Sequence, residues 1–425
     1  MSNGLTQNHP LIQTGTAQNL GERLVKKKFP NIPAQIRAAL FYFFYLAAIG
    51  TTAPFLYVVY RQHGLTPAEI GVVIAVAHVM NFIASPIWGA ANDLRQQKGG
   101  LHLLPLACLC AGPSILLLQG ARGLAPILLA VILWGFFAWS IISLADAATL
   151  NMLGNNRHHY GRVRVWGSLG SVCASLAVGL LGTQLGLEIV FPLYVIMLLA
   201  CAAVSFSFPK VDYEKSPSVN AGISHLFRNP RTVFFFLSIF LLAMGYMGWR
   251  GTFSLYLEDM KATTGVIGAF FAIGSALEIP IAASSPWWLK RWGAGASLIT
   301  SFAFFSFLWI GCSLIGEPTL ALPLALVHGF SYGIYDVAGV VYVGQVAPPG
   351  FTSLAQGVYG GINRGLGSIL GSLVGGFLFQ NIGGAVTYRI SALFGLLALG
   401  CLVRINDHSI KEINYEGRGN QPRFF

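Results

Sequence analysis

The segments GSVCASLAVGLLGTQLG at 170–186 and GSILGSLVGGFLFQNIG at 367–383 are two versions of one apolar helix, 197 residues apart. A second pair has the same offset, IGVVIAVAHVMN at 70–81 and IGAFFAIGSALE at 267–278. Two separate pairs with one offset indicate that the chain is a duplication with both halves built in the same order. Glycine and serine recur four residues apart in 170–186 and 367–383, and small residues at this spacing allow helices to pack closely in lipid.

The composition indicates a membrane protein. Of the 425 residues, 55% are hydrophobic and only 10% are charged, with a mean hydropathy of +0.64, whereas a soluble domain carries roughly 25% charged residues. A helix needs about 20 apolar residues to cross the bilayer, and helices satisfy their own backbone groups in lipid. The predicted spans are 37–60, 68–91, 101–119, 123–147, 162–183, 186–208, 232–257, 263–287, 294–315, 319–346, 352–379 and 383–404.

These spans predict an all-α integral membrane protein with twelve transmembrane helices in two pseudo-symmetric six-helix bundles. Parallel repeats of this kind are found in the major facilitator fold, in which the substrate site lies between the halves near the bilayer midplane. The expected domains are a disordered cytoplasmic tail at 1–36, a bundle at 37–208, a cytoplasmic linker at 209–231, a second bundle at 232–404 and a cytoplasmic tail at 405–425.

The basic residues predict the orientation. Of the 26 Lys and Arg residues, Arg61, Arg122, Lys261 and Arg389 fall in loops on one side, and two more lie inside spans. The remaining 20 fall on the side of the termini, which the positive-inside rule makes cytoplasmic. This topology explains the net charge of +11, and the scatter of basic residues through short loops argues against nucleic-acid binding. We expect a multi-pass protein of the plasma membrane, the inner membrane of a bacterium, with both termini in the cytoplasm.

Ionisable side chains inside spans are costly in lipid, so each one suggests a function. The second half has Glu278, Asp336, Arg250 and Arg364 at membrane depth, while the first half offers only a histidine and Asn81 on one helix face. A carboxylate that exchanges its arginine partner as a cavity changes sides would change its proton affinity, as proton symport requires. We predict Glu278 and Asp336 as proton-coupling residues and Arg364 as their counter-ion. The alternative is that fixed ion pairs hold the helices together.

Polar helix faces are expected to line one substrate cavity, because residues four apart lie on the same face of a helix. Two arginines favour a carboxylate, which Arg can bind with two hydrogen bonds, and a sugar or nucleoside remains open. For the histidine of the tenth span, the alternative is a hydrogen-bonded interior histidine. The predicted substrate-binding residues are Asn81, Tyr246, Arg250, His328, Tyr332, Gln356 and Asn363.

Charged residues near the cytoplasmic ends of the spans are expected to form a gate. An ion pair between Asp146 and Arg164, at the ends of the fourth and fifth spans, would close that side of the protein. The alternative is a solvated pair that acts only as a topology signal. The predicted gating residues are Asp93, Arg95, Asp146, Arg162 and Arg164.

Enzymatic motifs are not found: the sequence has no nucleotide-binding loop, metal cluster or nucleophile–base pair at recognisable spacing. The chain is therefore expected not to be an enzyme and to need no cofactor and no metal. The six cysteines all fall in predicted spans and are expected to be buried, unpaired thiols. The expected partners are a small organic solute, a proton and membrane lipid, with no nucleic acid, and the protein is expected to be a monomer.

Short motifs carry a resemblance to a known family. GAANDLR at 89–95 resembles a degenerate form of the major facilitator loop between the second and third spans. LADA at 144–147 followed by YGRVRVWGS at 160–168, together with GLTPAEIG at 64–71, is similar to the phenylpropionate permeases, which are relatives of lactose permease and the nucleoside permeases. The resemblance covers nearly all of 37–404. It implies proton-linked import of a small organic solute, with the coupling residues on spans seven to eleven.

The chain departs from lactose permease in two places. Lactose permease places a His and a Glu three residues apart on the tenth span, whereas His328 and Asp336 are eight apart. The fourth span has no mid-depth acid to match the glutamate that binds sugar in that family, which argues against galactoside transport. A uniporter or a proton-coupled exporter on the same fold, or a non-transporting membrane receptor, are the alternatives to a symporter.

Overall fold

The computed structural model describes residues 33–97, 103–153, 160–208, 230–346 and 352–416. Within these ranges, eleven helical segments are long and apolar enough to cross a membrane, and Leu104–Gly120 is a shorter apolar segment that supplies the twelfth. The predicted all-α membrane fold with two bundles is confirmed. Residues 1–32 of the expected tail at 1–36 and residues 209–229 of the expected linker at 209–231 lie outside the described residues, and helix α2 already begins at Ala34.

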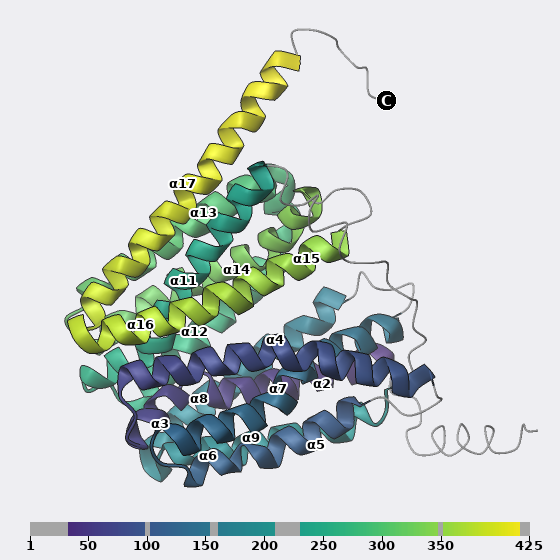
Figure 1. Cartoon of the computed structure of the whole chain (residues 1–425), viewed down its shortest axis with the longest axis vertical. Helices are drawn as coiled ribbons and strands as arrows, with labels where there is room; N and C mark the ends of the chain where they lie inside the picture. Colours follow the sequence, from purple (N-terminus) through teal and green to yellow (C-terminus); the bar gives the residue numbers. More distant parts are fainter. Residues whose placement is uncertain (1–32, 98–102, 154–159, 209–229, 347–351, 417–425) are drawn as a thin grey trace, which may run out of the picture.

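The first half forms the bundle drawn in purple to blue in Figure 1. Proline interrupts two of its spans, because it lacks the N–H group that continues a helix: Pro54 lies between α2 and α3, and Pro113 precedes the break between α5 and α6. The elements of this half are α2 Ala34–Thr52, α3 Leu56–Gln62, α4 Pro67–Gln97, α5 Leu104–Ser114, α6 Leu116–Gly120, α7 Leu124–Leu153, α8 Tyr160–Leu185, η2 Leu187–Ile189 and α9 Val190–Ser205.

The second half forms the bundle drawn in green to yellow in Figure 1. Its last helix continues to Glu416, beyond the span end expected at residue 404, although the apolar part of the helix ends at Ile405. The elements are α11 Pro230–Asp259, α12 Thr264–Ala283, α13 Ser285–Leu314, η3 Pro318–Leu320, α14 Ala321–Val346, α15 Thr352–Gly360, the π-helix η4 Gly361–Gly367, α16 Ser368–Ile382 and α17 Gly384–Glu416.

The sequence repeat is also a structural repeat. Gly186 and Gly383 occupy equivalent positions, and each ends its helix with a positive φ, +80° and +79° respectively. L-residues with a side chain rarely adopt such angles, so glycine ends both helices at the same point. The duplicated sequence therefore specifies the same helix end in both bundles.

Small residues bring the two halves into backbone contact. Helix α4 of the first half packs on α16 of the second, and α8 packs on α12. A Cβ atom placed on Gly71 would lie 2.5 Å from the carbonyl oxygen of Ser372, and one on the equivalent Gly268 would lie 2.6 Å from that of Ser175. The interface between the halves is thus made twice, by equivalent residues, and it leaves no room for larger side chains.

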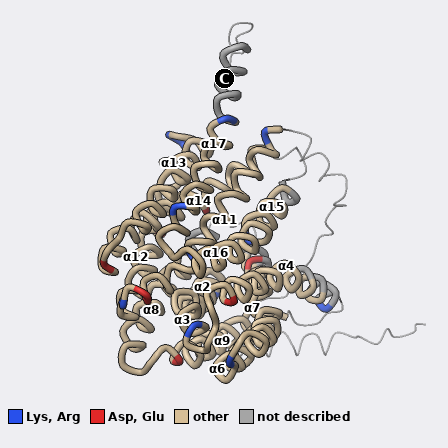
Figure 2. The backbone as a smooth tube through the Cα atoms, turned by 60° about the vertical axis from the view of Figure 1, so that its left-hand side comes forward, with Lys and Arg blue, Asp and Glu red and all other residues tan. Residues whose placement is uncertain are grey.

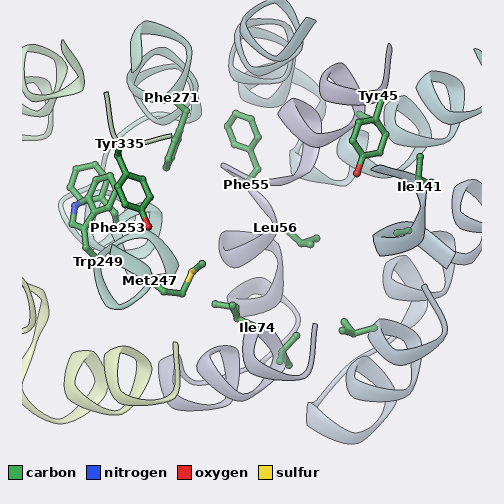
Figure 3. Close-up of a cluster of buried hydrophobic side chains, with 14 of the residues drawn as sticks. Tyr45, Phe55, Leu56, Ile74, Ile141, Met247, Trp249, Phe253, Phe271 and Tyr335 are labelled. Carbon is green, nitrogen blue, oxygen red and sulfur yellow. The ribbon is translucent and has the colours of Figure 1, made fainter. Parts of the chain in front are cut away.

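Large aromatic side chains fill the interior of each half. Figure 3 shows part of this buried cluster, with Trp249 and Phe253 of α11 close to one another. Their ring centroids are 5.1 Å apart, and the Phe253 ring lies 4.7 Å from that of Phe270 on α12. All three side chains are fully buried. Aromatic pairs at these distances stabilise beyond their buried area, and here they fix α12 against α11.

One end of the molecule, which we call the Arg61 end, carries polar contacts between the halves. Arg61 of α3 lies 3.3 Å from the carboxylate of Glu258 and 2.5 Å from that of Asp259, both at the end of α11. Nearby, Ser254 donates a hydrogen bond of 2.6 Å to the carbonyl oxygen of Pro54. The amide of Ala68 donates to the side chain of Gln380 at 3.0 Å. The two halves are therefore joined at this end.

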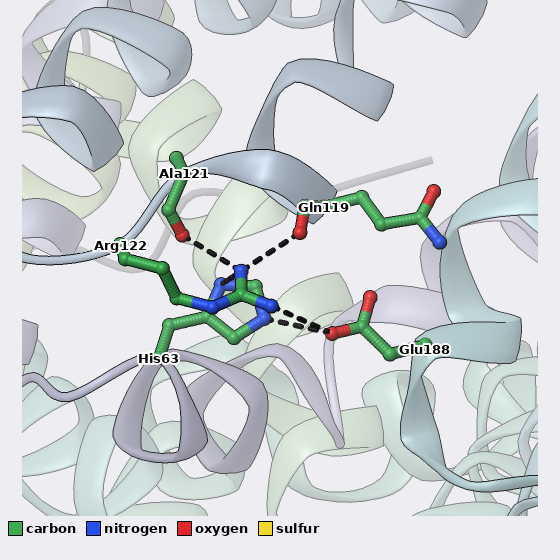
Figure 4. A network of polar contacts seen from close by, with 5 residues as sticks. All are labelled: His63, Gln119, Ala121, Arg122 and Glu188. Atoms are coloured by element: carbon green, nitrogen blue, oxygen red, sulfur yellow. Dashed lines mark hydrogen bonds and ion pairs between the residues drawn. The ribbon is translucent and has the colours of Figure 1, made fainter.

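A second network at the Arg61 end lies within the first half (Figure 4). The buried His63 ring is 2.9 Å from the Glu188 carboxylate through Nε2 and 3.1 Å from the Arg122 guanidinium through Nδ1. Arg122 also donates to the carbonyl oxygens of Gln119 and Ala121. The network joins the end of α3 to the two connections before α7 and α9, and so fixes the loop that follows Arg61.

The cysteines depart in part from the expectation of buried thiols. All six are unpaired. Cys173 is exposed, because it belongs to a stripe on α8 that faces away from the protein, together with Trp166, Leu169, Leu176 and Leu180. The buried thiols are Cys108, Cys201 and Cys312.

Replacement of Gly376 by alanine tests the contact between the halves. A Cβ atom at this position would lie 2.6 Å from the carbonyl oxygen of Pro67 and 3.0 Å from the Cα atom of Gly71. We expect Gly376→Ala to destabilise the protein by about 1–3 kcal/mol, as overpacking does, with a lower midpoint of thermal unfolding in detergent. Gly400→Ala is the matched control, since nothing lies within 4 Å of its Cβ position. Equal midpoints for the two variants would contradict the backbone contact.

Candidate functional site

Two carboxylates of the second half lie at similar distances along neighbouring helices. At a rise of about 1.5 Å per residue, Glu278 of α12 and Asp336 of α14 lie about 21 Å and 22 Å from the starts of their helices at the Arg61 end. They are near enough to interact electrostatically, and Arg250 of α11 is within the same range of Glu278. Glu278 is half-buried, and Asp336 is exposed. Glu278, Asp336 and Arg250, which the sequence predicted as ionisable residues at membrane depth, thus belong to one cluster.

Glycines set the separation of these two carboxylates. A Cβ atom on Gly329 of α14 would lie 2.3 Å from the carbonyl oxygen of Gly274 on α12. One turn further, a Cβ on Gly333 would lie 3.4 Å from the Cα atom of Glu278 itself. Helices α12 and α14 therefore touch backbone to backbone next to the acidic pair.

The arginines approach this pair without forming a close ion pair. The guanidinium carbon of Arg250 lies 5.0 Å from the centre of the Phe271 ring, a cation–π contact. Arg364 is exposed and lies within electrostatic range of Asp336 and Tyr332. Among the described residues, no carboxylate lies within 4.0 Å of either arginine. The fixed ion pairs of the alternative hypothesis are therefore not formed in this conformation.

Arg364 lies on a π-helix, which sequence analysis did not predict. The segment GINRGLG forms η4, and the hydroxyl group of Ser368 donates to the carbonyl oxygen of Asn363, five residues earlier, at 2.8 Å. Short π-helices are rare and are frequent at functional sites. Their wider turn changes the register that a regular helix would give to Asn363 and Arg364. The only available signal was the density of glycines at 360–367.

His328 is enclosed by aromatic rings. Its ring centroid lies 5.3 Å from that of Trp249, 5.9 Å from that of Tyr332 and 6.2 Å from that of Tyr246. The side chain is about 3% exposed, and neither ring nitrogen has a hydrogen-bond partner among the described residues. The hydrogen-bonded interior histidine of the alternative interpretation is therefore not observed. The predicted residues Tyr246, His328 and Tyr332 lie together and flank the acidic pair.

The first half contributes a group of neutral polar side chains that sequence analysis only partly identified. Ser85 of α4 donates to the carbonyl oxygen of Trp139 on α7 at 3.2 Å and lies 3.4 Å from Asn81. Ser143 of α7 donates to Ser85 at 3.3 Å. Asn81 and Ser85 are four residues apart, a spacing that could have identified the second residue. By contrast, the predicted Gln356 binds the carbonyl oxygen of Val340 at 2.7 Å and joins α15 to α14.

The predicted gating residues Asp146 and Arg164 both contact Tyr42 of α2. The Tyr42 hydroxyl donates to the Asp146 carboxylate at 2.5 Å, and the Arg164 guanidinium lies 5.1 Å above the Tyr42 ring. These three residues join helices within the first half. Arg95 is exposed near the end of α4. The predicted gating side chains of Asp93 and Arg162 lie outside the described part of the structure.

The ion pair at the Arg61 end was missed by sequence analysis, although the repeat offered a signal. Glu258 lies 197 residues after Arg61, which is the offset of the repeat. Residues at equivalent positions can meet only where the two halves meet on their pseudo-symmetry axis. Opposite charges at equivalent positions near the ends of spans one and seven therefore indicate a contact between the halves.

The sequence pattern of the MFS_1-like family matches residues 35–390. The chain belongs to this family of major facilitator transporters. It is 25% identical over 370 residues to the maltose permease of Geobacillus stearothermophilus, covering 86% of this chain and 93% of the permease. It is also 25% identical over 375 residues to the probable 3-phenylpropionic acid transporter of Escherichia coli (strain K12), covering 85% and 95%.

Solved structures agree on the fold. The nucleoside transporter NupG superimposes with a TM-score of 0.75 at 17% identity, over 88% of this chain and 99% of NupG. The human organic anion transporter MFSD10 superimposes with a TM-score of 0.62 at 16% identity, over 88% and 100%. The protein is thus a multi-pass membrane transporter of the major facilitator superfamily and not an enzyme, as the sequence predicted.

Arg61→Gln tests the ion pair between the halves. The pair is partly exposed, so we expect its loss to open the Arg61 end only modestly. The labelling rate described next should rise roughly twofold to fivefold. The measurement is the rate at which a maleimide modifies a cysteine introduced at Ala68, with the six native cysteines replaced by serine. Arg389→Gln is the control, because this exposed arginine lies near the start of α17 at the same end. An unchanged rate in Arg61→Gln would show that the pair does not hold the halves together.

Proposed function

We propose that the protein is a proton symporter that carries a small organic solute across the membrane by alternating access. The observation that supports this proposal best is the cluster of Glu278, Asp336, Arg250 and Arg364, in which opposite charges lie within electrostatic range and yet more than 4.0 Å apart among the described residues. A structural ion pair would be closed. Groups that exchange partners during transport need to be near one another without being held in a closed ion pair.

The proton would be carried by the acidic pair. Two ionised carboxylates in electrostatic range repel one another, and a proton on either removes the repulsion. When the halves rock and an arginine approaches, the ionised carboxylate becomes favoured and the proton leaves. Because Asp336 is exposed while Glu278 is half-buried, we assign proton exchange with water to Asp336 and the coupling step to Glu278, with Arg364 as the counter-ion.

The solute would bind between the acidic cluster and the polar group of the first half. Arg250 can bind a carboxylate, and the rings of Tyr246, Tyr332 and His328 can stack on a cyclic solute. The hydroxyl and amide groups of Asn81 and Ser85 would bind its polar end. The relatives named for maltose and for 3-phenylpropionic acid support a sugar or a carboxylate. We favour a carboxylate, because neither arginine has a carboxylate partner within 4.0 Å among the described residues.

The same proposal includes the topology. The tails at 1–36 and 405–425 and the linker at 209–231 would be cytoplasmic, in a plasma or bacterial inner membrane, with bundles at 37–208 and 232–404 working as a monomer. The Arg61 end would then face outward. The contacts of Arg61, Ser254 and Gln380 would close that side in this conformation. The contacts of Tyr42 with Asp146 and Arg164 would belong to the cytoplasmic gate.

A ligand screen followed by transport assays tests the proposal. Maltose, nucleosides and 3-phenylpropionate are compared by the thermal stabilisation they give to the purified protein. The ligand that stabilises it is then assayed in proteoliposomes, with and without an inward proton gradient. We expect Glu278→Gln to abolish gradient-driven accumulation while retaining exchange of labelled for unlabelled solute, because binding and rocking persist without the titrating group.

The matched control is Glu317→Gln, an exposed glutamate in the connection before α14, which should keep both activities. Full accumulation by Glu278→Gln would remove that residue from the coupling role. Transport by the wild type that does not respond to a proton gradient would favour a uniporter, and accumulation driven in the opposite direction would favour an exporter.

A further inference from the structure

A short helix before the ninth span has features that neither the fold nor the transport site requires. Helix α12 ends at Ala283, and a new helical segment starts at Ser285. The chain then kinks at Gly293, whose φ of +74° is a conformation that favours glycine, before α13 enters the bundle. The segment 285–292, SPWWLKRW, is therefore turned away from the helices on both sides of it.

This segment exposes two aromatic and two basic side chains. Trp287 is 61% exposed and Trp292 is 45% exposed, with ring centroids 5.7 Å apart. Lys290 and Arg291 between them are also exposed, and no carboxylate lies within 4.0 Å of either among the described residues. Basic residues gather at this end of the second half, near the labels α13 and α17 in Figure 2.

The third tryptophan anchors the segment to the transport machinery. Trp288 is about 3% exposed, and its indole nitrogen donates to the carbonyl oxygen of Ile281 at 3.0 Å. Ile281 lies on α12, three residues after Glu278. In the repeat, 286–292 is equivalent to 89–95, where the first half has GAANDLR instead of PWWLKRW. At the same point the second half thus has three tryptophans and two basic residues, where the first half has mainly small residues, one acid and one arginine.

We propose that Trp287, Lys290, Arg291 and Trp292 form a binding site for the headgroup of an anionic phospholipid in the cytoplasmic leaflet. Tryptophan is enriched at the level of the headgroups, where its ring lies against the apolar layer and its N–H group lies in the hydrated headgroup region. Lysine and arginine near the surface are attracted to anionic lipid. The site rests on the proposed topology, which puts this end in the cytoplasm, and it does not depend on proton coupling.

The lipid holds the segment and, through Trp288, the end of α12. An anionic headgroup accepts hydrogen bonds from the two basic side chains, while the two exposed indoles enter the interface beside it. A protein partner would also bind exposed tryptophan and arginine. The lipid is favoured because the segment lies directly between two membrane spans, where the proposed topology puts the chain at the cytoplasmic surface of the bilayer.

The test uses the full-length protein in liposomes that contain phosphatidylcholine and phosphatidylglycerol in equal amounts, with one or the other brominated in its acyl chains. Bromine quenches tryptophan fluorescence only at contact. The signal of Trp287 and Trp292 is taken as the difference between the wild type and Trp287→Phe/Trp292→Phe. We expect brominated phosphatidylglycerol to quench this signal more than brominated phosphatidylcholine. The variant Lys290→Gln/Arg291→Gln should reduce this preference for phosphatidylglycerol roughly fivefold for each basic residue removed.

The control variant is Lys261→Gln/Arg389→Gln, which removes two basic residues at the Arg61 end and should leave the preference unchanged. Equal quenching by the two lipids would overturn the anionic site, and the absence of quenching by either would show that the segment faces water or a protein. Transport is not measured, so a failure of proton coupling at Glu278 would leave these results unaffected.

Discussion

Contact between helix backbones at small residues is the constraint on which the rest of this structure depends. In lipid, helices gain little from hydrophobic burial against one another, so packing must hold them together. The chain achieves close packing at Gly71 on Ser372 and at the equivalent Gly268 on Ser175. The same principle acts inside the second half, where Gly329 and Gly274 bring α14 against α12. The distance between the two carboxylates therefore follows from residues that carry no charge themselves.

The duplication explains both the predicted and the unexpected features of the interface. Because α4 and α12 are equivalent, as are α8 and α16, the helix packing between the halves exists twice. The pair of Arg61 and Glu258 is different, since its two members occupy the same position in the repeat. Such a pair can be made only on the axis that relates the halves. An ancestral repeat with one residue at this position would have put like groups in contact, and opposite charges in the two copies turn that contact into an attraction.

The fold could be predicted from the sequence, and so could the residues that make up the ionisable cluster, because both predictions depend on local signals. Long apolar runs predict spans, and an acid such as Glu278 within a span is conspicuous. It was insufficient where geometry depends on neighbours. The π-helix around Arg364 is a small departure from regular hydrogen bonding that glycine permits but does not dictate. Likewise, nothing local to Tyr42 indicates that it lies between Asp146 and Arg164. Gln356 was placed on the correct helix, yet its contact with Val340 depends on how α15 meets α14.

The two halves of the repeat differ in the chemistry of their polar groups at membrane depth. At the position of Glu278 the first half has Asn81, so one copy has a group that can exchange a proton and the other has an amide that can only hydrogen-bond. Around Asn81 the structure places Ser85 and Ser143, which are also neutral. A single charged half is also the simpler physical solution, because ionisable groups in both halves would repel or pair across the interface as the halves move. If the charges stay in the second half, where the carboxylates and arginines can still change partners, the first half can rock against it at a lower electrostatic cost.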